Sequence, residues 1–321
     1  MISDEIIRGQ IGHAIERTDF RCLGSKFEGK VRDNYRNGRD MVIVTTDRIS
    51  AFDRVLGTIP FKGQVLNQLA AFWFDQTSHI VDNHVIDVPD PNVMLVKECQ
   101  GIPVEMIVRG YITGVTKTSA WYNYSNGVRN LCGNVLPEGL KKDQKFDHPI
   151  ITPTTKLEEH DRSVSREEII KEGLVDAKTF DRMAEISLKL FDFGTRVAAK
   201  HGLILADTKY EFGLLDGKII LIDEIHTPDS SRFWFADTYQ KLFSEGNEQR
   251  KLDKEYVRTW LAERGFLGDG KIPKIPEEVV VEAAKRYIES YETITGRKFI
   301  VSEGNVMERI KSSLLAKGFP V

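Results

Sequence analysis

The sequence has few of the features expected of a secreted or membrane protein. It contains three cysteines in 321 residues, none in a CxxC pair, which argues against a disulfide framework and a structural zinc site. No apolar run approaches the ~20 residues that a membrane-spanning helix requires. The first ten residues, MISDEIIRGQ, lack a basic segment followed by an apolar run, so we expect no signal peptide and a cytoplasmic location.

A large excess of charge of one sign is also missing. The 45 basic and 48 acidic side chains leave a formal net charge of −3, which gives no overall attraction to nucleic acid or anionic lipid. We therefore expect neither a nucleic acid nor a membrane as partner. The hydrophobic content of 41% is typical of a globular protein, and 321 residues exceed one ordinary core, so we expect two or more lobes.

The most informative stretch is residues 203–235, which reads as two apolar strands around an Asp216-Gly217 turn. Carboxylates interrupt these strands, with a lysine and an arginine among them: Asp207, Lys209, Glu211, Asp223, Glu224, Asp229 and Arg232. Carboxylates on otherwise apolar strands are costly to bury unless they are paired or bound to a metal. We expect the chemistry to be located here.

A second candidate element lies near the N-terminus. Asn37-Gly38 predicts a hairpin turn between strands at residues 30–35 and 40–46. Lys30 and Arg32 would point to one face of the first strand, and Gly29 would let the backbone approach a ligand. Two interpretations stay open with similar weight, a glycine-led hairpin that covers phosphates and an exposed basic hairpin.

Two motif matches are rejected. Residues 24–30 read GxxxxGK, but Val31 follows where a P-loop needs Ser or Thr, and a strand pattern replaces the helix. Asp192-Phe193-Gly194 spells the DFG of protein kinases, but it lies within a helical pattern and no HRD precedes it.

The rest of the chain indicates an α+β fold with two lobes and a cleft. Helical periodicity predicts helices over residues 4–20, 64–80, 176–201, 251–264, 276–295 and 305–317. Strands are expected at 93–97 and 103–109, with residues 98–101 as a hinge between lobes. His160 and Asp161 lie in a polar loop, where a catalytic role is less expected than simple exposure.

Several motifs in order resemble the SAICAR synthetase family: GKVRD, SAFD, VRGYITG, TPTTKLEEHD, ADTKYEFG, DEIHTPDSSRFW and YIESYETITGRKF. The resemblance runs from about residue 25 to Phe299. It implies an ATP-dependent ligase that joins L-aspartate to the carboxylate of CAIR, a ribotide carrying an imidazole carboxylate, and gives SAICAR, ADP and phosphate in purine synthesis. It further implies Mg²⁺ and an acyl-phosphate. The alternatives are a kinase-like phosphotransferase and a non-catalytic nucleotide sensor.

The resemblance also implies an architecture. It suggests an antiparallel-sheet N-terminal lobe, an ATP-grasp-like C-terminal lobe and C-terminal helices packed alongside. The corresponding domains are residues 1–102, 103–245 and 246–321.

By the same resemblance, the site residues divide by role. Catalysis is assigned to Lys209, Asp207 and Arg232. ATP binding is assigned to Gly29, Lys30, Val31, Arg32, Lys97, Glu211 and Asp223, the last two also holding Mg²⁺. Substrate binding is assigned to Ser50, Asp53, Arg109, Ser119, His160, Asp161 and Arg232. The family often has serine where this chain has Val115, so Thr113, Thr116 or Ser119 would have to supply that contact with phosphate.

The metal role places a condition on the acidic hairpin. A two-residue turn pairs Leu215 with Lys218 and puts Asp223 on the face opposite Glu211. One more residue in the turn pairs Leu215 with Ile219 and sets Glu211 across from Asp223. We therefore predict a longer turn or a bulge.

Overall fold

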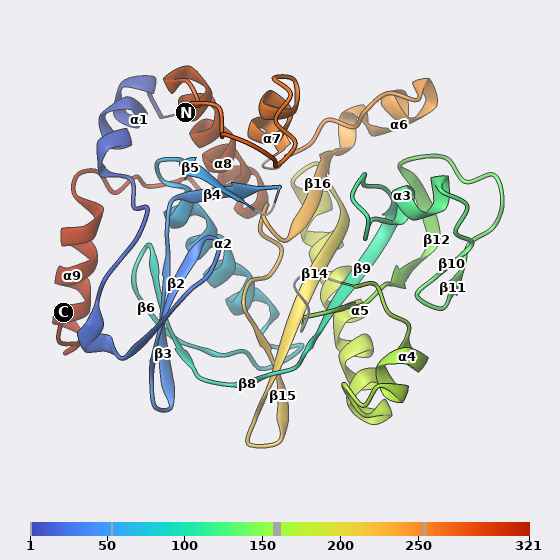
Figure 1. The fold of residues 1–321 in the computed structure, drawn as a ribbon, viewed down its shortest axis with the longest axis horizontal. Coiled ribbons are helices and arrows are strands. Elements are labelled where there is room, and N and C mark those ends of the chain that lie inside the picture. Colours follow the sequence, from blue (N-terminus) through green and yellow to red (C-terminus); the bar gives the residue numbers. More distant parts are fainter. Residues whose placement is uncertain (1, 53, 157–161, 253–254) are drawn as a thin grey trace. The chain divides into compact units, whose positions relative to one another are not determined.

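The computed structural model describes residues 2–52, 54–156, 162–252 and 255–321 (Figure 1). The chain forms two compact units. The first comprises Met1–Phe74, His84–Glu98 and Asp253–Val321, and the second comprises Asp75–Asn83 and Cys99–Leu252. The strands named below pair with one another in antiparallel orientation, and both units also contain helices, so the predicted α+β class is confirmed in this coarse form. Within the described ranges, no helix combines the length and apolar character needed to cross a membrane.

The first unit is built on a five-stranded sheet in the order β1-β2-β3-β7-β6. These strands are β1 (Ser25–Glu28), β2 (Arg32–Asn37), β3 (Asp40–Thr45), β7 (Val93–Lys97) and β6 (Val85–Asp90), and β4 (Arg48–Ala51) pairs separately with β5 (Arg54–Thr58). The predicted hairpin is confirmed, because Asn37 pairs with Asp40. Gly38, the first of the two loop residues, has a φ of +76°, a conformation that favours glycine.

The helices of the first unit are α1 (Asp4–Gln10), α2 (Lys62–Thr77, whose last turn belongs to the second unit), α7 (Glu255–Ala262), α8 (Glu277–Thr295) and α9 (Val306–Ala316). α1 is shorter than predicted and continues only as a 3-10 turn at Ile11–His13. Val306, Ile310 and Leu314 of α9 are buried in one core cluster with residues of β2 and β3. The C-terminal segment is therefore part of the core of this unit.

The second unit is built on a larger sheet around β14 (Leu203–Leu215). Its main path is β12-β9-β14-β15, and β16 and β8 also pair with β14. The other bounds are β8 (Gln100–Gly101), β9 (Val104–Ile112), β10 (Asn130–Leu131), β11 (Asn134–Val135), β12 (Gln144–Ile151), β13 (Thr154–Thr155), β15 (Lys218–Ile222) and β16 (Ser231–Phe235). The helices are α3 (Ala120–Ser125), α4 (Arg166–Lys171), α5 (Ala177–Lys200) and α6 (Ala236–Glu245).

Helix α5 packs against β9 and β14 (Figure 1). It begins where predicted, since the Asp176 carboxylate accepts a hydrogen bond from the Thr179 amide at 3.0 Å. A Cβ atom at Gly110 of β9 would lie 3.1 Å from the Phe191 ring, and one at Gly194 would lie 2.3 Å from the ring of His226. The glycine of the DFG sequence thus makes room for a buried histidine, and the sequence lies inside α5 as predicted.

The turn of the acidic hairpin differs from the prediction. Leu215 pairs with Lys218, so the loop is the tight pair Asp216-Gly217 and the predicted longer turn is wrong. Asp216 and Gly217 have φ values of +50° and +75°, the left-handed pair that a twisted two-residue hairpin requires. The local preference of Asp-Gly therefore decided the register.

The surroundings of Gly194 and of Gly9 predict opposite effects of alanine substitution on stability. Gly194→Ala should lower the free energy of unfolding by about 1–3 kcal/mol, because the added methyl has no space beside His226. Gly9→Ala in α1 should raise it by up to about 1 kcal/mol, because no atom lies within 4 Å of the new methyl and alanine favours a helix. Denaturant titration measures both, and a Gly194→Ala protein as stable as wild type would contradict this packing.

Candidate active site

One face of the sheet in the second unit carries a group of charged residues. Alternate residues of a strand point to the same side, so Asp207, Lys209 and Glu211 of β14 share a face. Asp207 lies directly opposite Arg109 of β9 on one side and Arg232 of β16 on the other. The register of three strands, with an irregularity between Leu205 and Asp207, thus sets three charged residues in one row.

The carboxylate of Asp207 is shared by both arginines. Its Oδ2 accepts hydrogen bonds from Nη1 of Arg109 at 3.1 Å and from Nη1 of Arg232. Arg109 is buried and also donates to Thr152 Oγ1 at 2.7 Å and to the carbonyl of Thr118 at 2.9 Å. Burial lowers the pKa of the Arg109 guanidinium, with Asp207 opposing this shift and Arg232 adding to it. Arg109 is thus held rigidly, whereas the side chain of Arg232 stays 28% exposed.

The loop after β9 closes around this row. Gly114 has a φ of +90°, and a Cβ atom there would lie 2.4 Å from Ser119 Oγ and 2.9 Å from an Arg232 Nη2. Ser119 is buried and exchanges a 2.7 Å hydrogen bond with Thr116. Val115 is 59% exposed, so it takes no part in this packing. Of the three hydroxyls predicted to replace the family's serine, Ser119 is the one placed beside Arg232, while Thr113 donates to Asp143.

A second cluster surrounds the ammonium group of Lys209. Nζ of Lys209 lies 3.0 Å from Glu105 Oε1 and 3.7 Å from Asp223 Oδ2, and it also contacts Glu211. Lys156 forms an ion pair with the other oxygen of Glu211. Burial alone would lower the pKa of Lys209, but Asp223, Glu105 and Glu224 outweigh it and the pKa is raised. Lys209 is therefore a partly buried cation held among carboxylates.

Glu211 and Asp223 reach the same ammonium without the predicted change of register. The ladder between β14 and β15 ends at the pair Glu211–Ile222, and Asp223 follows with a φ of +69°. This left-handed backbone, which Asp tolerates better than most residues, turns the chain out of the strand alternation. A backbone kink at Asp223 thus does what a longer turn was predicted to do.

Two residues of this face were not predicted as site residues. Glu105 hydrogen-bonds Lys209 and accepts from Thr154 Oγ1 at 3.2 Å, and Lys156 pairs with Glu211. The signal for Glu105 was present in the sequence, because a carboxylate inside the apolar strand PVEMIV needs a buried partner.

The remaining predicted residues lie elsewhere. Gly29, Lys30, Val31, Arg32, Ser50 and Lys97 belong to the first unit. Asp53, His160 and Asp161 lie outside the described residues. The structure therefore brings together two groups within the second unit, Arg109–Asp207–Arg232 with Ser119, and Lys209 with Glu211 and Asp223.

The two carboxylates offer hard oxygen donors of the kind that Mg²⁺ prefers. Magnesium sites of nucleotide enzymes commonly use one or two carboxylates together with phosphate and water oxygens. Within the described parts of the chain, no group of three or more His, Cys, Asp or Glu residues is arranged to hold a metal. Glu211 and Asp223 are thus the two carboxylates of this cluster that could serve as such donors.

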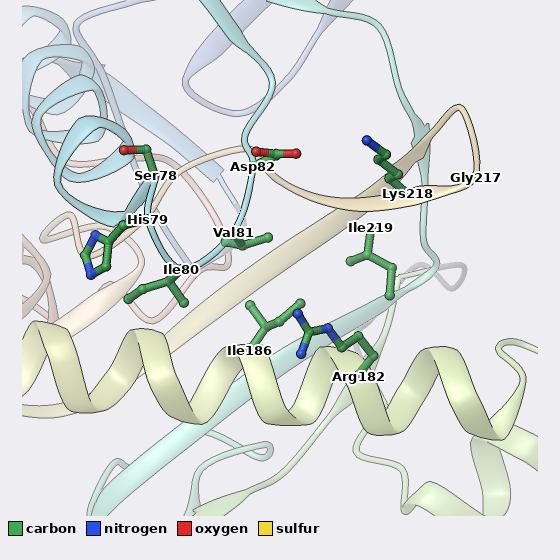
Figure 2. Close-up of a pocket in the computed structure, with 10 residues that line it drawn as sticks. All are labelled: Ser78, His79, Ile80, Val81, Asp82, Arg182, Ile186, Gly217, Lys218 and Ile219. Atoms are coloured by element: carbon green, nitrogen blue, oxygen red, sulfur yellow. The ribbon is translucent and has the colours of Figure 1, made fainter.

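A cavity of about 460 Å³ lies in another part of the second unit (Figure 2). It is lined by residues 78–82, Arg182 and Ile186 of α5, and residues 217–219 at the tip of the acidic hairpin. Figure 2 shows Ile186 side by side with the guanidinium group of Arg182, and Asp82 and Lys218 above them. The charged residues of the predicted site are not among its lining, so this cavity is separate from the site.

Comparison with known proteins decides the family. A family model described as SAICAR synthetase matches residues 25–273. The chain belongs to the SAICAR synthetase family. The phosphoribosylaminoimidazole-succinocarboxamide synthase of Legionella pneumophila (strain Paris) is 50% identical over 292 residues, which cover 90% of this chain and 94% of the relative.

Solved structures agree with membership of the SAICAR synthetase family. The SAICAR-synthase from Saccharomyces cerevisiae complexed with SAICAR is 36% identical with a TM-score of 0.80, covering 90% of this chain and 100% of the other. A SAICAR synthetase in complex with ADP is 26% identical with a TM-score of 0.65, covering 86% and 100%. The family predicted from the sequence motifs is confirmed.

His226 follows the acidic hairpin and is completely buried. Its Nε2 lies 2.6 Å from the hydroxyl of Tyr210, whose side chain projects from the face of β14 opposite Lys209. Burial lowers the pKa of His226 from 6.5 to about 3, because the protonated ring cannot be solvated there. His226 is therefore neutral and structural at ordinary pH.

The depressed pKa of His226 predicts a loss of stability in acid. The unfolded state binds a proton below pH 6.5 and the folded state only below about 3, so the unfolding free energy should fall as pH decreases through this window. The slope contributed is up to about 1.4 kcal/mol per pH unit. Denaturant titration between about pH 7 and 5 should show a shallower slope for His226→Asn. Equal slopes for wild type and His226→Asn would contradict the assignment.

Proposed function

We propose that this protein is an ATP-dependent ligase that joins L-aspartate to the carboxylate of CAIR and releases SAICAR, ADP and phosphate in purine biosynthesis. The observation that carries the proposal is the charged face of the second unit, on a chain of the SAICAR synthetase family. Two arginines on this face share the carboxylate of Asp207. One lysine, Lys209, lies among three further carboxylates. These groups suit a phosphorylated ribotide and a transferred phosphoryl group.

Arg109 and Arg232 would bind the 5′-phosphate of the ribotide. Two guanidinium groups against one Asp207 carboxylate leave net positive charge, and each guanidinium offers paired donors that match phosphate oxygens. The partly exposed Arg232 can turn toward a ligand, while Arg109 stays fixed by Thr152 and Thr118. Ser119 would add a hydroxyl contact, and Asp207 would orient both arginines.

Lys209 would act where the phosphoryl group passes from ATP to the CAIR carboxylate. A carboxylate is a poor acyl donor because oxide is a poor leaving group, whereas an acyl-phosphate loses phosphate readily. In the proposed reaction, a carboxylate oxygen attacks the γ-phosphorus and releases ADP. The aspartate amine then attacks the acyl carbon, releases phosphate and loses a proton. A fixed ammonium stabilises the charge on the transferred oxygens.

Glu211 and Asp223 would hold Mg²⁺, which would neutralise charge on the ATP phosphates. Both carboxylates already share a cation in Lys209, so the pair is arranged for positive charge. Glu105 would keep Lys209 in place from the neighbouring strand.

We assign Gly29, Lys30, Val31, Arg32 and Lys97 to ATP, and Ser50, Asp53, His160 and Asp161 to the imidazole or the aspartate. We retain the domains 1–102, 103–245 and 246–321, with two lobes, the second ATP-grasp-like, as the working description.

A substrate-omission assay tests the ligase. With ATP, Mg²⁺, CAIR and L-aspartate present, ADP release should accompany SAICAR formation, and omission of CAIR or of aspartate should abolish sustained turnover. Chromatographic measurement of ADP and SAICAR decides the matter. ADP release that continues at full rate without both acceptors would refute the proposal.

Lys209 and Lys218 lie on the same hairpin and provide a matched pair of variants. Lys209→Ala should lower kcat by at least about 100-fold, because the transferred phosphoryl group loses its fixed cation. Lys218→Ala, at the exposed start of β15, should retain wild-type turnover. Thermal unfolding of both proteins checks that the fold persists, and near-normal turnover by a folded Lys209→Ala protein would remove Lys209 from the mechanism.

A further inference from the structure

The loop between β1 and β2 is held by its backbone carbonyl groups. Arg48 Nη2 donates to the carbonyl of Gly29 at 2.9 Å, and Arg48 Nε donates to that of Lys30 at 3.0 Å. The carbonyl of Val31 accepts from the backbone amide of Thr46 at 3.0 Å and from Thr46 Oγ1 at 2.8 Å. Three consecutive carbonyl groups are thus held by one short segment of the chain.

This arrangement is unlike an extended strand, where successive carbonyl groups alternate in direction. In a trans peptide, the N–H of one residue points opposite to the carbonyl of the residue before it, and the described chain contains no cis peptide bond. The three fixed carbonyl groups therefore direct the N–H groups of Lys30, Val31 and Arg32 away from Arg48 and Thr46. Successive N–H groups that point to one side of a turn provide the donors of concave anion-binding sites.

Arg48 itself is firmly fixed. It is buried, and its Nη2 also donates to Asp33 Oδ1 at 2.8 Å, while Nη1 donates to the carbonyl of Glu16. Burial favours the neutral form of Asp33, but hydrogen bonds from Thr18, Arg48 and Lys26 outweigh it and lower the pKa of this carboxyl. Arg48 thus rests on an ionised carboxylate inside the first unit and cannot shift without breaking that pair.

We propose that Arg48 and Thr46 are positioning residues that shape the backbone of residues 29–32 into an anion site for the polyphosphate of a nucleotide. The inference rests on the proposed ligase function and adds to it. The glycine loop is assigned to ATP there through its own residues, whereas here the shape of the loop is assigned to two side chains outside it. Arg48 does not touch the ligand and acts through the carbonyl groups it holds.

A purely structural role for these residues makes a different prediction. If Arg48 and Thr46 only stabilised the unit, their loss would lower stability and affect all ligands alike. If they shape an anion site, their loss weakens binding of ATP and leaves binding of adenosine, which lacks phosphate, unchanged. The contrast between ATP and adenosine therefore separates the two roles.

The chain offers a matched control for the decisive variant. Thr46→Val removes the Oγ1 hydrogen bond to Val31 while keeping size, and the backbone amide bond remains. Thr45→Val makes the same change one residue earlier, at another buried threonine whose hydroxyl bonds Asn67 at 3.4 Å rather than the loop. Arg48→Lys keeps the buried charge but cannot donate to Gly29 and Lys30 with a planar fork.

The experiment measures binding of ATP with Mg²⁺ and of adenosine by calorimetry, and steady-state KM and kcat, on the full chain. Thr46→Val should raise Kd and KM for ATP about fivefold, and Arg48→Lys about tenfold, since one or two hydrogen bonds to the loop are lost. Binding of adenosine and KM for aspartate should match wild type, and Thr45→Val should match wild type throughout.

Equal weakening of ATP and adenosine by Thr46→Val, or an effect of Thr45→Val as large as that of Thr46→Val, would overturn the inference. Unchanged ATP binding in both Thr46→Val and Arg48→Lys would do so as well. Failure of the proposed function has a different signature. It would appear in the wild-type protein, as absence of ligation, before any variant is compared.

Discussion

The charged face of the second unit depends on one buried carboxylate placed between two arginines. Asp207 occupies the middle strand of three, and without it Arg109 and Arg232 would repel each other across the sheet. Its single charge leaves the row positive. Lys209 lies two residues after Asp207 on β14. The cluster around it contains two cations, Lys209 and Lys156, and three carboxylates, so its net charge is negative. One strand therefore presents a positive site and a negative site about 7 Å apart, the spacing of two strand residues. An anionic ribotide and a cation-bound nucleotide would need this polarity.

A sheet can carry such charge because its two faces are separated by strand alternation. Odd-numbered residues of β14 hold the charged face, while Thr208, Tyr210 and Phe212 face the other side and are fully or almost fully buried. Helix α5 approaches closely enough that Gly110 and Gly194 have no room for a Cβ atom. Tight packing on one side of the sheet keeps the backbone of β14 rigid. A rigid backbone in turn fixes the positions of the charged groups on the other side.

Much of the fold followed from local patterns, and much of the site did not. The periodicity of α5 and α8 and the Asn-Gly hairpin are local properties, and the structure confirms them. The row of Arg109 and Asp207 joins residues 98 apart in sequence, so only the pairing of β9 with β14 reveals it. The turn at Asp216-Gly217 shows how a functional argument can mislead. Local turn chemistry set the register, and the left-handed backbone of Asp223 met the functional requirement at a position where no strand pattern predicts it.

Glu105 and Arg48 show which residues a motif-based interpretation overlooks. Both are charged and buried, and each contacts another group of a proposed site: Glu105 the ammonium of Lys209, and Arg48 the carbonyl groups of the glycine loop. Such residues can be recognised from the free-energy cost of burying a charge. A buried charge must find an opposite charge or several hydrogen bonds, so a lone Glu or Arg in an apolar strand implies a partner elsewhere in the chain. When the partner is itself a functional group, the buried charge fixes the position of that group. An unexplained charge in a predicted core strand is therefore a reason to look for a site beside it.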